Sequence, residues 1–292
     1  MRLTLKPVGP DFVAVASGLD LRRPLTAAAV AAIEAAMDHY AVLVFHDQPL
    51  DEEQQLAFTR SFGRLDIGLK KVFRAPNRFK HEESIDISNV GMDGALVARD
   101  SAKLYSNIAN QLWHSDSSFQ RPAAKYSVLT AQVVPGRGGE TEFADMRAAY
   151  DALTEDMKEL LEDKIGEHWA LHSRMMLGDT AYTEAQKATI PPVEWPLVRE
   201  HAGSRRKHLF IGVHVRRILG MTLPEGRMLL LDLLEHATQR KFVHQHIWGV
   251  GDLVMWDNRC VLHRGRHFDP AQRRELRRST VDDLTGADEQ AA

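Results

Sequence analysis

Apolar residues recur at helical spacing in a small number of segments of the chain. Most of these segments follow a residue whose side-chain oxygen suits a helix N-cap, and one of them begins near Pro224, which suits a first helical turn. We therefore predict short helices separated by long stretches of other structure. The capping residues are Thr26, Asp51, Asp145 and Thr154, and the predicted helices cover 27–39, 52–62, 146–164 (two successive helices) and 225–239.

The other apolar runs are short, rich in β-branched residues and bounded by Gly, Pro or Asn. Runs of this kind are typical of buried β-strands. Strands dominate the second half of the chain, and helices lie near its start and in insertions, which predicts a mainly β sandwich or barrel with flanking helices. The predicted strands are Ala41–Phe45, Val128–Val134, Leu209–Val213, Phe242–Trp248 and Leu253–Trp256.

Residues 64–108 mix Gly, Pro, Asn and charged residues without a clear period, which predicts long loops or a mobile lid. The tail from residue 285 is small and polar, which predicts disorder. No segment has the composition of an interdomain linker. We therefore expect residues 1–292 to form a single domain.

Composition and charge narrow the functional class only slightly. The formal net charge of −3 argues against a dedicated nucleic-acid binder, which is usually basic over its whole domain. The one cysteine, Cys260, excludes an internal disulfide and argues against a thiolate metal site. The first residues lack a long apolar segment, and the run Ala27–Ile33 is too short to span a bilayer. We expect a cytoplasmic protein that does not enter membranes.

The first candidate chemistry lies in the segment Gln111–Phe119, which contains His114-Ser115-Asp116. In extended backbone, residues two apart place their side chains on the same face, so this imidazole and carboxylate would lie side by side. Such a pair suits a divalent metal of intermediate softness. The motif alone is weak evidence for a metal site, because a surface histidine near an acidic residue has the same sequence pattern.

A second histidine, His263, follows a strand and a polar turn in the segment Gly251–Arg264. With His114 and Asp116 it would complete a two-histidine, one-carboxylate triad, which leaves one side of a metal open for oxygen chemistry. A zinc or manganese hydrolase could use the same ligands. The motif therefore predicts a metal site and leaves its chemistry open.

An arginine-rich run, Arg273–Arg278, follows the distal histidine. If it is a strand, Arg274 and Arg278 share one face. Arginines that point into a barrel are costly unless they bind anions, so we expect these two to bind carboxylates. For Arg273 and Arg277 we expect a solvated position or pairing with acids. A nucleic-acid or partner-binding surface is the alternative for the whole run.

With these motifs in register, the sequence resembles the taurine dioxygenase-like family of Fe(II)/2-oxoglutarate-dependent dioxygenases, and most closely its aryloxyalkanoate-degrading branch. The resemblance extends from Val8 to Leu284. It implies a double-stranded β-helix, or jelly-roll, core. It is densest in the segments Asn110–Phe119, Gly138–Leu153, Gly251–Arg266 and Arg273–Arg278.

The resemblance also implies roles for individual residues. It implies that His114, Asp116 and His263 hold Fe(II). It implies that Thr141 and Arg274 hold the far carboxylate of 2-oxoglutarate. It implies that Arg278 and Lys71 hold the carboxylate of the organic substrate, with Lys70 as the alternative to Lys71.

The expected reaction uses O2 and 2-oxoglutarate to hydroxylate the carbon beside the ether oxygen of an aryloxyacetate such as 2,4-dichlorophenoxyacetate. The products would be a phenol, glyoxylate, succinate and CO2. A sulfonate or a sulfate ester is the alternative substrate, because Arg278 would accept either anion. The partner is thus expected to be a small anionic molecule. The sequence leaves open the natural substrate, any preference between enantiomers and the formation of a homo-oligomer.

Overall fold

The computed structural model describes residues 2–71, 77–180 and 182–284. Its largest feature is an eight-stranded sheet in which only β2 and β3 run parallel. Strand β16 lies inside this sheet, paired with β6 on one side and with β4 and β5 on the other. The order is β1 (Thr4–Pro7), β2 (Val13–Ser17), β3 (Val42–Phe45), β14 (Leu253–Asp257), β6 (Ala124–Val133), β16 (Glu275–Asp282) and β4 (Leu65–Asp66), with β5 (Ile85–Ser88) beside β16.

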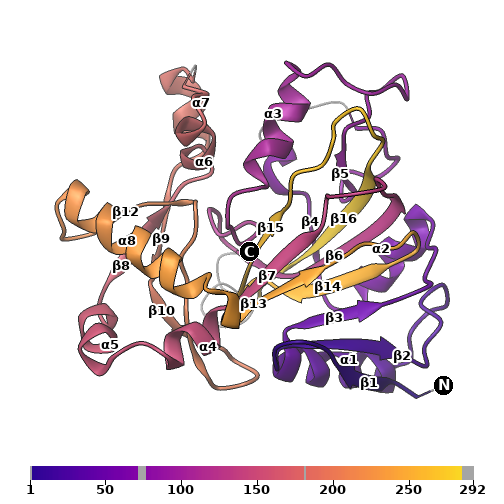
Figure 1. Cartoon of the computed structure of the whole chain (residues 1–292), viewed down its shortest axis with the longest axis horizontal. Helices are drawn as coiled ribbons and strands as arrows, with labels where there is room; N and C mark the ends of the chain where they lie inside the picture. Colours follow the sequence, from indigo (N-terminus) through magenta and orange to yellow (C-terminus); the bar gives the residue numbers. More distant parts are fainter. Residues whose placement is uncertain (1, 72–76, 181, 285–292) are drawn as a thin grey trace.

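A smaller antiparallel sheet in the order β13–β7–β15 faces the large one (Figure 1). Side chains of both sheets meet in one buried apolar cluster, in which Phe143 of β7 packs against Trp256 of β14. Both rings are almost fully buried, and aromatic burial contributes strongly to a core of this kind. Two facing sheets of mainly antiparallel strands confirm the predicted mainly β jelly-roll core. The smaller sheet contains β13 (Val243–His246), β7 (Thr141–Asp145) and β15 (Val261–Gly265).

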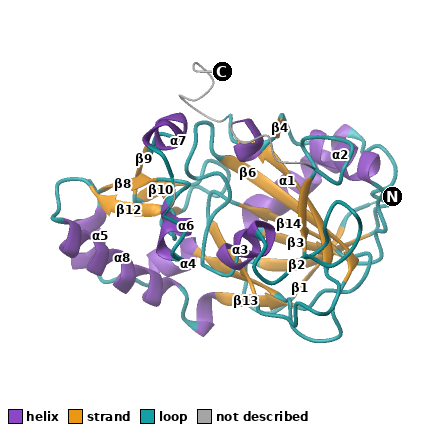
Figure 2. Cartoon of the chain, turned by 90° about the horizontal axis from the view of Figure 1, so that it is seen from above, coloured by secondary structure: helices purple, strands orange, loops and turns teal. Residues whose placement is uncertain are grey.

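Helices α1 (Ala27–Tyr40) and α2 (Glu52–Arg60) cover the outer face of the large sheet (Figures 1 and 2). Both begin where the sequence predicts. The Thr26 hydroxyl accepts a hydrogen bond from the Ala29 amide, and Asp51 forms a reciprocal capping box with Gln54.

A second group of elements, between β7 and β13, lies to one side of the two sheets (Figure 2). It contains the predicted helix pair and the predicted long helix, together with short strands that the sequence did not reveal. No helix in the described parts of the chain has the length and apolarity needed to cross a membrane. The elements are α4 (Met146–Asp151), α5 (Glu155–Leu161), β8 (Ile165–His168), α6 (His172–Met176), α7 (Glu184–Thr189), β9 (Val193–Pro196), β10 (Val198–Glu200), β11 (Lys207–Leu209), β12 (Val215–Ile218), α8 (Leu223–Ala237) and η2 (Arg240–Phe242).

Two segments differ from the sequence prediction. The strand expected at Leu209–Val213 ends at Leu209, because the chain turns at Gly212, whose φ of 131° is unfavourable for other residues. Residues 64–108 are not loops throughout, since they contain β4, η1 (Gly68–Lys71), β5 and α3 (Ala102–Ala109). The tail predicted from residue 285 lies outside the described residues.

Candidate active site

The two predicted histidine ligands are brought together by main-chain pairing. The His114 amide donates to the His263 carbonyl at 3.0 Å, and the His263 amide donates back at 2.8 Å. The chain leaves the extended form directly after this bridge, so Asp116 lies in a turn and Ser117 has a φ of 51°. The Asp116 carboxylate nevertheless lies 3.9 Å from His114 Nε2 and 3.8 Å from His263 Nε2.

The donor set fits a divalent metal ion. Candidate ligand atoms of His114, Asp116 and His263 all lie within 4.8 Å of one another, and all three residues are buried. His114 Nδ1 lies 2.7 Å from the Leu112 carbonyl oxygen, which assigns the proton to Nδ1 and leaves Nε2 free to bind a metal. His263 Nδ1 is also buried and has no hydrogen-bond partner among the described residues.

Burial and charge keep this donor set in the required protonation states. Burial lowers the pKa of His114 and holds the pKa of His263 well below its ordinary value. Burial would raise the pKa of Asp116, but the charge of the nearby Arg278 guanidinium outweighs it, and the pKa is lowered to about 2. Two neutral imidazoles and one carboxylate are the forms that bind metal near neutral pH.

The position of Asp116 depends on Asn258, which the sequence did not single out. Asn258 Oδ1 accepts from the Asp116 amide at 3.1 Å and from Trp256 Nε1 at 3.0 Å. Its amide nitrogen donates to Ser127 Oγ, and that hydroxyl donates to Asp116 Oδ2 at 2.7 Å. Asn258 stands in the polar turn between β14 and β15, five residues before His263, and this was its only signal in the sequence.

Arg274 and Thr141 line the same cavity as the two histidines. Arg274 is 8% exposed; its Nη2 donates to the Gly139 carbonyl at 3.1 Å, and its Nε has no hydrogen-bond partner among the described residues. Burial lowers the pKa of Arg274 to about 10. Thr141 is buried and accepts from Trp248 Nε1 at 3.0 Å, which leaves its hydroxyl proton free for a ligand.

The turn before Thr141 is built from two glycines, which allow the Arg274 side chain to approach the main chain of the turn. Gly139 has a φ of 75°, and a Cβ at this position would come within 3.0 Å of Arg274 Nε. Gly138 has a φ of 81°, and a Cβ there would meet the His267 carbonyl oxygen at 2.5 Å. Only glycine fits both positions without strain.

The predicted sharing of one face by Arg274 and Arg278 holds, although Arg274 lies just before β16. Arg274 and Arg278 both line the central cavity, and the Arg278 guanidinium forms an ion pair with Asp116. Arg273 is half-exposed and pairs with Glu275, as expected.

The prediction that Arg277 is solvated or paired with an acid is wrong. Its side chain is 5% exposed and donates to Gln55 Oε1 and to the Leu50 carbonyl, both at 2.8 Å. The physical reason is that β16 lies inside the sheet and α2 covers its outer face, so this side of the strand does not reach solvent.

The cavity has a volume of about 210 Å³ and is lined by both charged and apolar residues. We call the lining formed by the histidines, Thr141 and the two arginines the charged side, and the lining formed by β5 and α3 the apolar side. Other apolar residues lie next to the charged ones: the Trp256 ring is 4.6 Å from the His263 ring, and Leu129 of β6 pairs with Arg278 of β16. The apolar residues along the cavity are Ile87, Leu104, Ile108, Leu129, Trp256, Phe268 and Pro270.

Lys71, the predicted substrate lysine, ends the short helix η1. Its side chain and that of Lys70 lie outside the described residues. The choice between the two lysines therefore stays a prediction.

Known proteins resemble this chain over almost its full length. The model of the family described as "Taurine catabolism dioxygenase TauD, TfdA family" matches residues 4–280. An alpha-ketoglutarate-dependent 2,4-dichlorophenoxyacetate dioxygenase from Cupriavidus pinatubonensis is 58% identical over 96% of this chain and 98% of that protein. An (S)-phenoxypropionate/alpha-ketoglutarate-dioxygenase from Sphingobium herbicidovorans is 38% identical over 95% and 94%. The crystal structure of AAD-2 with Mn(II) and N-oxalylglycine has a TM-score of 0.90 and 48% identity, over 97% of each chain.

Proposed function

The chain belongs to the TauD, TfdA family of dioxygenases, and from this premise we propose that it is an Fe(II)- and 2-oxoglutarate-dependent dioxygenase of aryloxyacetates such as 2,4-dichlorophenoxyacetate. Its products are a phenol, glyoxylate, succinate and CO2. The 58% identical relative that carries this activity in its name supports the choice of substrate. Mn(II) and N-oxalylglycine in the AAD-2 structure support the choice of a divalent metal and an oxo-acid co-substrate.

His114, Asp116 and His263 would hold the iron. When bound, Fe(II) couples the oxidative decarboxylation of 2-oxoglutarate by O2 to hydroxylation of a substrate C–H bond. His114 and His263 line the cavity, and a set of two histidines and one carboxylate would leave coordination positions free for O2 and the co-substrate. Ser127 and Arg278 hold the Asp116 carboxylate in place, and Asn258 holds the Asp116 main-chain amide.

The observation that carries the proposal is the buried cation Arg274. A buried guanidinium is costly unless an anion accompanies it. Among the described residues no carboxylate forms an ion pair with Arg274, although the side chain lines the cavity beside Thr141. A carboxylate of 2-oxoglutarate would accept from the Arg274 fork and from the Thr141 hydroxyl.

Arg278 of β16 also lines the cavity, where its guanidinium forms an ion pair with Asp116. We assign it, with Lys71, to the substrate carboxylate, which would fix the carbon beside the ether oxygen next to the metal. Hydroxylation of that carbon gives a hemiacetal. Transfer of the hydroxyl proton to the aryl ether oxygen and cleavage of the C–O bond then release the phenol and glyoxylate.

The test is aerobic turnover with Fe(II), 2-oxoglutarate and a panel of aryloxyacetates, aryloxypropionates, cinnamates, sulfonates and sulfate esters. We expect phenol and succinate in equal amounts from an aryloxyacetate, and no product without Fe(II). Succinate formed mainly with a sulfonate or a sulfate ester would instead support that substrate class. Hydrolysis supported by Zn(II) or Mn(II) without 2-oxoglutarate would contradict an oxygenase.

We also propose that residues 1–292 form one domain and that residues 64–108 act as its lid. Support for a single domain comes from β5, which is part of this region and pairs directly with β16 of the core. Support for the lid comes from Leu104 and Ile108 of α3, which line the cavity. The cytoplasmic location and a homo-oligomeric state stay predictions from the sequence. A small-molecule substrate is consistent with the enclosed cavity.

A further inference from the structure

Helix α3 carries two apolar side chains along the cavity. Leu104 and Ile108 are spaced four residues apart, which places them on one face of the helix, and both line the cavity together with Ile87 of β5. Neither belongs to the buried apolar clusters of the described chain, and Ile108 is 39% exposed. An apolar helix face that lines a cavity, and that no part of the described protein covers, indicates a ligand surface.

We propose that this face of α3 receives the aromatic ring of the substrate, and that Lys103 is the positioning residue that holds the helix in place. The proposal rests on the proposed function for its ligand class, an aryloxy acid. A carboxylate held at Arg278 directs the rest of such a molecule into the same cavity, where the apolar wall lies.

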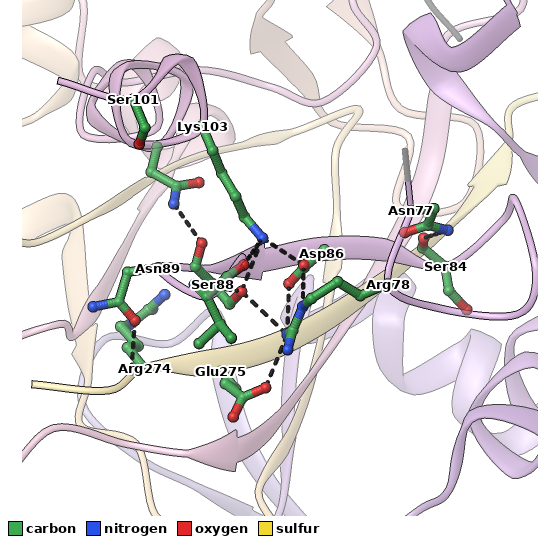
Figure 3. A network of polar contacts seen from close by, with 12 residues as sticks. Asn77, Arg78, Ser84, Asp86, Ser88, Asn89, Ser101, Lys103, Arg274 and Glu275 are labelled. Atoms are coloured by element: carbon green, nitrogen blue, oxygen red, sulfur yellow. Dashed lines mark hydrogen bonds and ion pairs between the residues drawn. The ribbon is translucent and has the colours of Figure 1, made fainter. Parts of the chain in front are cut away.

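Lys103 fastens α3 to β5 with all of its hydrogen-bonding capacity (Figure 3). Its ammonium group donates to Asp86 Oδ2 at 2.6 Å, to Ser88 Oγ at 3.2 Å and to the Val90 carbonyl. A lysine ammonium has three donors, so these acceptors occupy all of them. Lys103 is therefore not available to a substrate carboxylate, and its role is to position the helix.

The acceptor Asp86 is itself held by the core (Figure 3). Arg78 donates to Asp86 Oδ2 at 2.7 Å and to Glu275 Oε2 at 2.8 Å, which connects β5 to β16 through side chains as well as through the strand ladder. Burial would raise the pKa of Asp86, but hydrogen bonds from Arg78 and Lys103 outweigh it and keep the pKa below its usual value. The carboxylate therefore stays charged near neutral pH.

Two further contacts connect the Lys103–Asp86 ion pair to Arg274, the predicted co-substrate arginine. Asn107 of α3 donates to the Ser88 carbonyl at 2.8 Å. The next residue, Asn89, accepts from the Arg274 amide at 2.9 Å (Figure 3). Residues 86–90, which include the end of β5, thus hold both the helix that carries the wall and the main chain of Arg274, with Lys103 as the charged contact to the helix.

The test compares wild type with Lys103→Met in two measurements. Hydrogen exchange of the metal-free chain should show the α3 amides exchanging about tenfold faster in the variant, because a charge-assisted contact is lost. Anaerobic calorimetry with Fe(II) and 2-oxoglutarate should show about tenfold weaker binding of phenoxyacetate. Binding of methoxyacetate, which has the carboxylate and ether but no ring, should stay unchanged.

Lys103→Arg keeps the charge, so its affinity for phenoxyacetate should be close to that of wild type. If Lys103→Met acted only through a general loss of stability, restoring the charge would not restore this affinity. Asp86→Asn removes the charge from the other partner and should act in the same direction as Lys103→Met. Lys80→Met is the matched control, because Lys80 is exposed and pairs with Glu53 away from the cavity.

Unchanged hydrogen exchange of the α3 amides in Lys103→Met and Asp86→Asn would overturn the claim that Lys103 holds α3 in place. Equal weakening of phenoxyacetate and methoxyacetate, or no weakening of either, would overturn the ring assignment. Wild type that binds phenoxyacetate through the ring but releases no phenol would contradict the proposed function and leave this assignment standing.

Discussion

The two sides of the cavity are built in different ways. On the charged side, His114 and His263 are joined by a pair of main-chain hydrogen bonds, and Arg278 belongs to a strand inside the large sheet. On the apolar side, α3 is held to β5 mainly by side chains, with Lys103 as its charged contact. The two histidines and Arg278 are therefore fixed by main-chain pairing, and Asp116 is held by neighbouring side chains. The position of α3 depends mainly on a few polar side chains.

The difference indicates which properties each side controls. Main-chain ladders in a buried sheet open only with a large part of the fold, so the metal and co-substrate groups keep their geometry. A short helix fastened by side chains opens at lower cost and tolerates substitution. We expect changes on the charged side to abolish the reaction and changes on the apolar side to alter substrate preference.

The largest effect is expected from His114→Ala on the charged side. Loss of one of two imidazole ligands should reduce iron-dependent succinate formation to background and remove tight Fe(II) binding in calorimetry. The backbone bridge to His263 does not depend on the imidazole, so circular dichroism should show an intact fold. Full activity of the folded variant would refute the metal assignment.

An intermediate effect is expected from Asn258→Ala, which removes the acceptor for the Asp116 amide and for Trp256 Nε1. Buried donors without partners should lower the free energy of unfolding by about 2 kcal/mol, and Fe(II) affinity should fall about tenfold because a group that orients a ligand is lost.

Gln48→Ala is the control for Asn258→Ala. Gln48 also hydrogen-bonds main-chain groups, those of Leu21 and His46, but it lies outside the metal cluster. Chemical denaturation should show some loss of stability, whereas Fe(II) affinity should match wild type. Equal losses of metal affinity in both variants would show that Asn258 acts only through general stability.

The smallest effect is expected from Leu104→Ala on the apolar side. Leu104 is half-buried, so the lost apolar contact with a ring should cost about 1 kcal/mol, or about fivefold in the KM for phenoxyacetate. The KM for 2-oxoglutarate should not change. Tyr105→Ala is the control, because Tyr105 is an exposed neighbour on α3 that does not line the cavity. Equal effects of the two variants would contradict a specific wall.

The same contrast explains how much the sequence revealed. The core strands, most helix starts and the charged site depend on local patterns, such as the capping residues and the alternation that puts Arg274 and Arg278 on one face. Contacts set by tertiary structure were not predictable. Arg277 is buried only because α2 covers the sheet there, and Asn258 acts on Asp116 from a distant segment.

The wall formed by α3 was hidden for a related reason. The helix is amphipathic, but it is only eight residues long and lies in a region of mixed composition, so its period does not stand out in the sequence. Its packing comes from contacts with β5.

The central claim is that Arg274, just before β16, and Arg278, within it, hold two different anions. Titration of 2-oxoglutarate and phenoxyacetate into Arg274→Ala and Arg278→Ala, with Fe(II) and without O2, tests it most directly. We expect Arg274→Ala to weaken 2-oxoglutarate binding about 10- to 100-fold and Arg278→Ala to weaken phenoxyacetate binding by a similar factor, because each loses charge-assisted hydrogen bonds. Weakening of the same ligand by both variants would contradict the claim.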